Sequence, residues 1–168
     1  MEGHKMKTLC MALVISVCFL AGIIETDAQT NQTKLNQTEL MKQFLGNWKC
    51  ELSKNTNYLY EFRPFGDGLI CNAQVVIDGE IADSVKQLYG YDSITDKFIV
   101  AELIKSSSEI KLSSGWFTSE QSGKIVSTDP DQSEIKIDFE FQSPDIIKQT
   151  AVLGSNYIVE MTLNRIKD

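Results

Sequence analysis

The chain after Gly46 consists of short, strand-like runs, and in the clearest of them apolar and polar residues alternate one by one. At 135–141, for example, Ile or Phe occupies every odd position and a charged residue every even one. This period of two is typical of a strand with one face toward an apolar interior and the other toward water. Turn sequences such as Asp78-Gly79 separate ten such runs. We expect strands at 48–52, 58–62, 69–77, 83–91, 97–105, 109–117, 124–128, 133–142, 145–153 and 157–166.

The connections between these runs decide how the strands are arranged. No helical pattern lies between them, so the sequence offers no crossover for parallel pairing. An open antiparallel meander would expose two long edges, whereas closure into a barrel removes both. We therefore expect an all-β fold, an antiparallel up-and-down β-barrel of about 8–10 strands. A two-layer sandwich is the alternative.

One short N-terminal helix is expected before the first strand. Asn36 suits its N-cap, and Glu39 lies three positions later, as in a capping box. Gly46 is a suitable stop signal at the other end. The apolar residues at helical spacing share one face: Leu40, Met41, Phe44 and Leu45.

The first 28 residues have the pattern of an export signal. Lys5 and Lys7 precede an apolar run at 9–24, and small residues lead to Ala28. The run is shorter than the roughly 20 residues that span a bilayer. We expect cleavage near 28–29 and an exported protein, secreted or periplasmic, without a membrane span in its mature form; a membrane anchor is the alternative. The expected organisation is a signal peptide at 1–28, a flexible lead-in at 29–36 and a barrel domain at 37–168.

Charge and histidine content narrow the chemistry. The net charge of −7 disfavours nucleic acid as a partner, because an acidic surface repels phosphate groups. The only histidine, His4, lies in the expected signal. The rest of the chain therefore has no imidazole for a Ser-His-Asp or Cys-His system, or for histidine-ligated zinc or haem. We assign no catalytic residue and expect no metal or other cofactor, while carboxylate chemistry stays open.

Two questions about covalent modification also stay open. Cys50 and Cys71 either pair as a disulfide in an oxidising compartment or remain buried free thiols. Asn31 and Asn36 each begin a glycosylation sequon, which matters only in a eukaryotic host. Nothing in the sequence indicates the oligomeric state.

Short motifs give the chain a family resemblance. Gly46 and Trp48 form a Gly-x-Trp directly after the helix, and Arg165 ends the last expected strand. A Tyr-Gly-Tyr-Asp segment at 89–92 lies in mid-chain. Over roughly 38–167 the chain resembles lipocalins and related calycin barrels, in particular small exported bacterial lipocalin-like proteins. The resemblance implies that Arg165 packs across Trp48 at the closed end of a barrel, so we interpret Gly46, Trp48 and Arg165 as a structural motif.

The chain departs from two ligand mechanisms of that superfamily. The haem-binding nitrobindin branch uses a proximal histidine, which this chain lacks after His4. The cytosolic fatty-acid-binding branch holds a carboxylate with an Arg-x-Tyr in its last strand, whereas residues 165–167 are Arg-Ile-Lys. Neither mechanism carries over.

Aromatic residues dominate the faces that the alternation points inward. Such a lining suits a hydrophobic ligand with one polar end, although the same residues also suit a filled core. Glu102 shares the parity of Phe98 and Val100, so it either faces the interior as a binding or catalytic acid or is solvated at a bulge. The candidate ligand-binding residues are Tyr58, Tyr60, Phe62, Tyr89, Tyr91, Phe98, Glu102, Phe139, Phe141, Tyr157 and Met161.

Three functions from different classes follow. We expect an exported binding protein for a small hydrophobic or amphipathic ligand, which a cavity of several hundred Å³ would favour. A non-catalytic interaction or structural module would instead have a filled barrel and an exposed apolar patch. A carboxylate-based enzyme of the calycin kind would have an inward, desolvated acid paired with a tyrosine.

Overall fold

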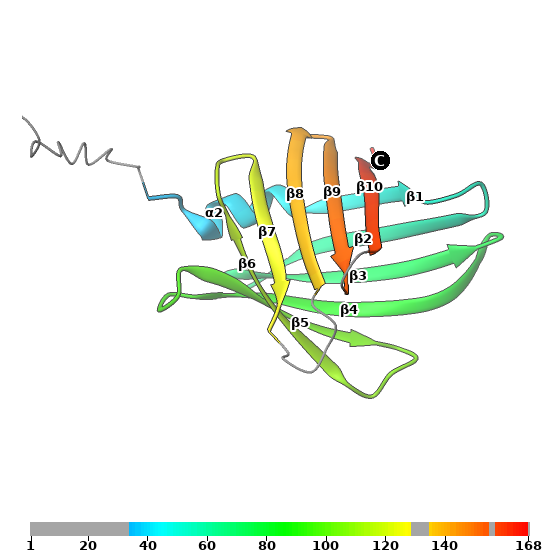
Figure 1. Ribbon diagram of the computed structural model, residues 1–168, viewed down its shortest axis with the longest axis horizontal. Coiled ribbons are helices and arrows are strands. Elements are labelled where there is room, and N and C mark those ends of the chain that lie inside the picture. Colours follow the sequence, from blue (N-terminus) through cyan, green and yellow to red (C-terminus); the bar gives the residue numbers. More distant parts are fainter. Residues whose placement is uncertain (1–33, 129–134, 155–156, 168) are drawn as a thin grey trace, which may run out of the picture. The chain divides into compact units, whose positions relative to one another are not determined.

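Ten antiparallel strands close into a barrel in the computed structural model, which describes residues 34–128, 135–154 and 157–167 (Figure 1). Each strand pairs with its neighbours in sequence, and β1 pairs with β10 to complete the ring. This confirms the prediction of an all-β, antiparallel up-and-down barrel. The strands are β1 (Gly46–Glu51), β2 (Thr56–Phe65), β3 (Gly68–Ile77), β4 (Glu80–Asp92), β5 (Lys97–Ile104), β6 (Ile110–Phe117), β7 (Ser122–Ser127), β8 (Ile135–Ser143), β9 (Ile146–Leu153) and β10 (Tyr157–Arg165).

Some of the expected features lie outside the described residues. These are the export signal at 1–28, most of the lead-in with the sequon at Asn31, and the first two residues of the strand expected at 133–142. Within the described ranges, no helix is both long and apolar enough to cross a bilayer.

β2 and β4 extend furthest beyond the ranges that the sequence pattern predicts. β2 continues beyond 62 to Phe65, and β4 begins at Glu80 rather than at 83. The β3–β4 hairpin turns tightly at Asp78 and Gly79, whose φ angles of 53° and 86° are both positive, so pairing continues to the tip. A register shift between Val75 and Val76 accommodates the extra length.

The helix begins as predicted but does not form the full capping box. α2 (Gln37–Met41) continues into the 3-10 turn η1 (Lys42–Phe44). Asn36 caps it, because its Oδ1 accepts the backbone N–H of Glu39 at 3.2 Å. The Glu39 carboxylate pairs with Lys42 Nζ at 2.7 Å instead of returning to the cap, since the ammonium one turn later is a charged partner.

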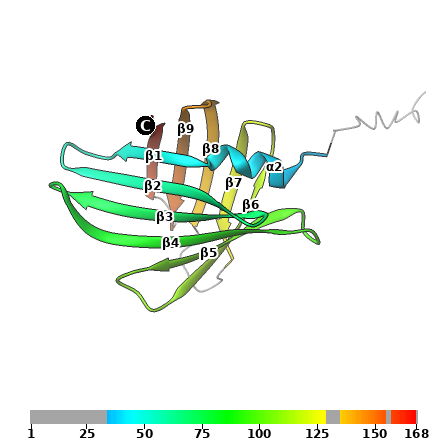
Figure 2. The same ribbon diagram turned by 180° about the vertical axis from the view of Figure 1, so that it is seen from behind.

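This helix lies at one end of the barrel, which we call the helix end. The β1–β2 and β3–β4 hairpins lie at the opposite end, which we call the hairpin end (Figures 1 and 2). Met41 and Phe44 are 1% and 3% exposed, so the helix buries its apolar face. The Phe44 ring centroid lies 5.1–6.5 Å from those of five other rings: Phe62, Tyr89, Phe117, Phe139 and Phe141.

Two glycines in neighbouring strands make room for this aromatic cluster. A Cβ at Gly115 of β6 would collide with the Phe98 ring, and one at Gly123 of β7 would collide with the Phe139 ring. Each ring therefore approaches the backbone at a position that carries no side chain. The helix end of the barrel is therefore filled with side chains down to the level of this cluster.

Candidate functional site

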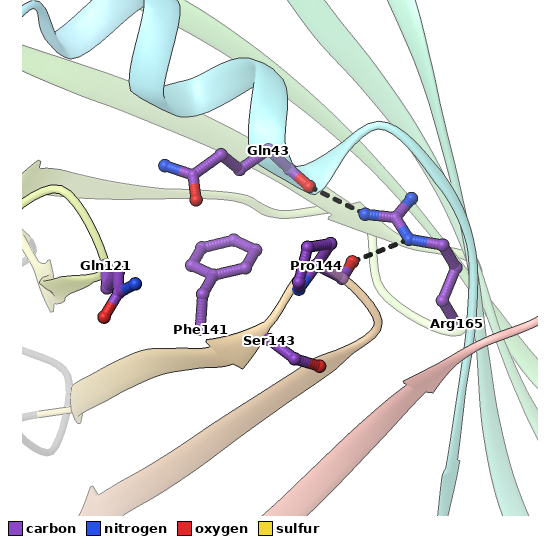
Figure 3. Close-up of a pocket in the computed structure, with 6 residues that line it drawn as sticks. All are labelled: Gln43, Gln121, Phe141, Ser143, Pro144 and Arg165. Atoms are coloured by element: carbon purple, nitrogen blue, oxygen red, sulfur yellow. Dashed lines mark hydrogen bonds between the residues drawn. The ribbon is translucent and has the colours of Figure 1, made fainter.

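Arg165 ties the helix end of the barrel together. Its guanidinium carbon lies 4.0 Å from the centroid of the Trp48 ring. It donates hydrogen bonds to the backbone carbonyls of Leu45 and Gln43, the latter at 3.2 Å, and of Pro144 at 2.9 Å. Figure 3 shows the bonds to Gln43 and Pro144. The first two carbonyls belong to the end of the helix, where they have no partner within the helix. A cation there also favourably meets the negative end of the helix dipole.

Gly46 and Trp48 fit the same arrangement. The φ angle of Gly46 is 114°, a region that side chains disfavour, and a Cβ there would lie 2.5 Å from Nη1 of Arg165. Trp48 is fully buried and donates its indole N–H to the Phe44 carbonyl oxygen at 2.7 Å. These contacts support the interpretation of the three residues as a structural motif.

A pocket of about 250 Å³ lies beside this motif, between the 3-10 turn and the β8–β9 turn. Its main polar group, the Arg165 guanidinium, is already directed at backbone carbonyls, and its Nε lies 3.4 Å from Asp145 Oδ1. We therefore interpret the pocket as a gap in the packing of the scaffold. It is lined by Gln43, Gln121, Phe141, Ser143, Pro144 and Arg165 (Figure 3).

Gln37 fixes the start of the helix to the barrel in a way that the sequence does not reveal. Its side chain is 7% exposed and lies against the end of β6. Its Oε1 accepts the Phe117 N–H at 2.7 Å, and its Nε2 donates to the Phe117 carbonyl at 3.1 Å. The amide thus satisfies two backbone groups at the point where β6 ends. Nothing in the local sequence distinguishes it from a solvated glutamine.

A second cavity, of about 260 Å³, lies inside the barrel. Its floor, toward the helix end, is formed by Phe44, Phe62 and Tyr89. One part of its lining, the apolar wall, comes from β2, β8 and β10: Tyr60, Ile135, Ile137 and Met161. Another part, the polar wall, comes from β4, β5 and β6: Gln87, Glu102, Lys111 and Ser113.

Three side chains of the cavity form a hydrogen-bonded relay. The Tyr89 hydroxyl donates to Gln87 Oε1 at 2.9 Å, and Gln87 Nε2 donates to Glu102 Oε2 at 2.6 Å. A carboxylate accepts hydrogen bonds only, so the Gln87 amide must present its nitrogen to Glu102 and its oxygen to Tyr89. The relay therefore orients the amide and holds the Glu102 carboxylate in place.

Burial further favours the protonated form of the tyrosines near this relay. Desolvation raises the pKa of Tyr89 well above its ordinary value of 10.0, and raises that of Tyr60 as well. Both phenols therefore keep their protons at neutral pH. Tyr89 is a permanent donor to Gln87, which is what the direction of the relay requires.

Strand register places an acid and a base side by side in the polar wall. Glu102 of β5 pairs with Gln87 of β4 on one side and with Lys111 of β6 on the other. Directly opposed residues with opposite charges usually attract one another. Among the ion pairs of the described residues, however, none joins Lys111 to Glu102. Both charged groups border the cavity and lie within reach of a ligand there.

The structure brings five of the predicted ligand-binding residues to the cavity: Tyr60, Phe62, Tyr89, Glu102 and Met161. Glu102 faces inward, so its solvated alternative is not what the structure shows. Tyr58 is half-buried and stacks on Tyr60 at 6.3 Å between ring centroids. Phe98, Phe139 and Phe141 are at most 3% exposed and belong to the packed core at the helix end.

Tyr91 and Tyr157 do not lie in the interior where the alternation placed them. They are 40% and 67% exposed, respectively. Each has the inward parity of its strand but lies at or next to a strand end, beyond the packed part of the barrel. The Tyr91 hydroxyl instead donates to Asp96 Oδ1 at 2.7 Å across the β4–β5 turn.

Sequence reasoning missed the polar side of the cavity. Gln87, Lys111 and Ser113 lie at inward positions of their strands, and Gln149 of β9 does too. Gln87 and Gln149 have a signal in the sequence, a polar residue whose neighbours two positions away are apolar, as for Gln87 between Val85 and Tyr89. Lys111 and Ser113 have no such signal, because Glu109, Lys111 and Ser113 form a polar series. When a strand is predicted from alternation alone, a polar residue at an inward position lowers the match to the pattern and does not indicate a site.

Cys50 and Cys71 are both free thiols, which answers the question that the sequence left open. They lie in β1 and β3, with β2 between them. Burial raises the pKa of the Cys71 thiol to about 12 and also raises that of Cys50. Both therefore remain protonated and unreactive in the folded protein at neutral pH.

Neither a metal site nor a similar protein of known function identifies the role of this cavity. In the part of the chain that the structure describes, no three His, Cys, Asp or Glu side chains gather as a metal site. No family model matches the sequence, and no curated protein matches it either. The ten-stranded barrel itself is compatible with a lipocalin-like fold.

Proposed function

We propose that this protein is an exported binding protein that holds a small amphipathic molecule inside the barrel. The observation that carries the proposal is the interior cavity of about 260 Å³, with an aromatic floor, mainly apolar residues from β2, β8 and β10, and polar residues gathered mostly on β4, β5 and β6. Small-molecule sites are mostly apolar cavities with a few convergent polar groups, typically of about 300–1,000 Å³. The volume lies just below this range, so the ligand is small.

The arrangement of apolar and polar residues around the cavity supports binding of a ligand in one orientation. Phe62 and Tyr89 close the cavity toward the helix end, where the aromatic cluster leaves no passage. The apolar body of a ligand packs against Tyr60 and Met161, and its polar end meets Glu102 and Lys111. Burial of the body supplies affinity, and the polar wall supplies orientation.

Export and family membership are parts of the same proposal. The basic residues, apolar run and small residues before Gln29 support cleavage and export. The packing of Arg165 on Trp48, next to Gly46, supports membership in the calycin superfamily as a lipocalin-like barrel. Fold alone does not imply function, so the cavity remains the basis for ligand binding.

The alternative functions have less support. Large apolar side chains do lie exposed on the outer faces of β4 to β6, as an interaction module would need: Leu88, Leu103, Ile110 and Leu112. A filled barrel, however, would not keep an interior cavity of this volume. The enzyme alternative needs an inward acid paired with a tyrosine, whereas the hydrogen bond that Glu102 accepts among the described residues comes from the Gln87 amide.

Native mass spectrometry of the protein purified from its own host tests the proposal. We expect a bound small molecule that leaves on mild activation. Ser113 and Ser114 are neighbours on β6, but only Ser113 lines the cavity, so they form a matched pair. Ser113→Phe should fill the cavity and abolish the bound mass, whereas Ser114→Phe should retain it. A bound mass that survives in both variants, or is absent from the unaltered protein, contradicts the proposal.

A further inference from the structure

The polar wall holds one acid and one base that are not used by the scaffold. Glu102 accepts a single hydrogen bond, from Gln87 Nε2 at 2.6 Å, and its Oε1 accepts none from the described residues. Lys111 is half-buried and takes part in no hydrogen bond or ion pair among them. One free acceptor and one free donor of opposite charge therefore border the same small cavity.

The acceptor is fixed in position before any ligand binds. Tyr89 donates to Gln87, and Gln87 donates to Glu102, so the carboxylate cannot rotate away without breaking a 2.6 Å hydrogen bond. The Lys111 ammonium ends a flexible four-carbon chain and can adjust to the ligand. The cavity thus combines a rigid acceptor with an adaptable donor from the next strand.

We propose that the ligand carries an uncharged head group that donates and accepts hydrogen bonds side by side, such as a primary carboxamide. This rests on the proposed function and specifies its ligand class. The N–H of the head donates to Glu102, and its C=O accepts from Lys111, so both hydrogen bonds are assisted by charge. The apolar body lies against Tyr60 and Met161.

Charged head groups fit this pair less well. A carboxylate would meet Lys111 but would be repelled by Glu102, and an amine would meet Glu102 but would be repelled by Lys111. A zwitterion would satisfy both groups, but only after two further charges had lost their water. A neutral donor–acceptor head satisfies both at the lowest desolvation cost.

Three probes that share one body test the inference: 3-phenylpropanamide, 3-phenylpropanoate and 3-phenylpropylamine. Calorimetric titration of the protein at neutral pH should show the amide binding about tenfold or more tightly than the acid or the amine. Glu102→Gln should weaken amide binding about tenfold and improve binding of the acid. Lys111→Met should also weaken the amide but improve binding of the amine. Lys86→Met, on the outer face of the adjacent strand, should change none of them.

The outcomes separate this inference from the proposed function. Tightest binding of the acid or the amine overturns the carboxamide head but leaves a ligand-binding cavity. Equal losses for all three probes in Glu102→Gln or Lys111→Met would show that these residues only shape the cavity, and also overturn the inference. If no probe binds at millimolar concentration, the head group is rejected, and the native mass spectrum decides separately whether the cavity holds a ligand.

Discussion

The two ends of the barrel use polar side chains in opposite ways. At the helix end, Arg165 and Gln37 together satisfy five backbone groups, on Gln43, Leu45, Pro144 and Phe117. In the cavity toward the hairpin end, Lys111 has no hydrogen-bond or ion-pair partner among the residues that the structure describes, and Glu102 has one. Both ends have a pocket of similar volume, about 250 and 260 Å³. The two pockets differ in whether their polar groups are already hydrogen-bonded within the protein.

This contrast is a physical criterion for separating scaffold from site. A buried polar group stabilises the fold when its hydrogen bonds are made within the protein. A polar group that borders a cavity without making its hydrogen bonds within the protein contributes little to stability. Such a group is available to a ligand. Substitutions at the helix end should therefore change the free energy of unfolding, and substitutions in the polar wall should change binding.

The largest effect is expected from Trp48→Ala at the helix end. Trp48 is fully buried, and its loss would leave a large void under Arg165. The free energy of unfolding should fall by about 3–5 kcal/mol, measured by urea unfolding followed by circular dichroism. Trp116 is a matched control, because it is only partly buried and packs against Lys97 at 4.4 Å on the outside. Trp116→Ala should cost clearly less, and equal losses would contradict the assignment of Trp48 to the core.

Alkaline pH should weaken the fold through its buried thiols. The unfolded chain loses the Cys71 proton above its ordinary pKa of 9.0, whereas the folded protein keeps it up to about 12. The unfolded state then binds fewer protons, so the free energy of unfolding falls as pH rises through this window, by about 1.4 kcal/mol per pH unit for this group. Urea unfolding at pH 8, 10 and 11 measures the slope. Cys71→Ala should make the slope shallower, most clearly between pH 8 and 10, because the raised pKa values of Tyr60 and Tyr89 add a dependence of the same sign above pH 10. An unchanged slope would show that the thiol is not the cause.

Gly46→Ala should have a smaller effect at the same end. The φ angle of 114° and the 2.5 Å approach to Arg165 predict a cost of about 1–3 kcal/mol, measured by thermal unfolding. Gly66 is the control, since its φ is 59° but a Cβ there would meet no atom within 4 Å. If Gly66→Ala costs as much as Gly46→Ala, the contact with Arg165 is not important.

Glu102→Gln should have the smallest effect on stability. The new amide oxygen can still accept from Gln87, and Glu102 makes no other hydrogen bond among the described residues. We expect the free energy of unfolding to change by less than about 0.5 kcal/mol. A loss of 2 kcal/mol or more would place Glu102 with the scaffold, and would remove the contrast between the two ends.

Much of this contrast follows from the sequence, but only at one end. Alternation of period two predicts the strands best where the inward side chains are apolar, as at Phe139 and Phe141 of the helix end. The Gly46 and Trp48 motif together with Arg165 predicts the closed end, since all three residues meet there. In this region the local sequence pattern and the tertiary packing favour the same structure, so the structure can be predicted from the sequence.

The cavity is harder to predict from the sequence, because several of its residues are polar at inward positions. Gln87 and Lys111 are polar at inward positions, and their proximity depends on the register of three strands, which the sequence does not fix. Tyr157 has the right parity but lies exposed at a strand end. Gln37 is a buried partner of a residue 80 positions away, a contact that no local pattern encodes.

An NMR titration of the isotope-labelled protein with each of the three phenylpropyl probes tests the central claim most directly. The probes differ only in their heads, so cavity binding by any of them is informative. We predict saturable shifts of backbone amide resonances around Gln87, Glu102 and Lys111, with those around Gln43 and Arg165 unchanged. Saturable shifts concentrated around Gln43 and Arg165 at the helix end would contradict the division of the barrel into scaffold and site.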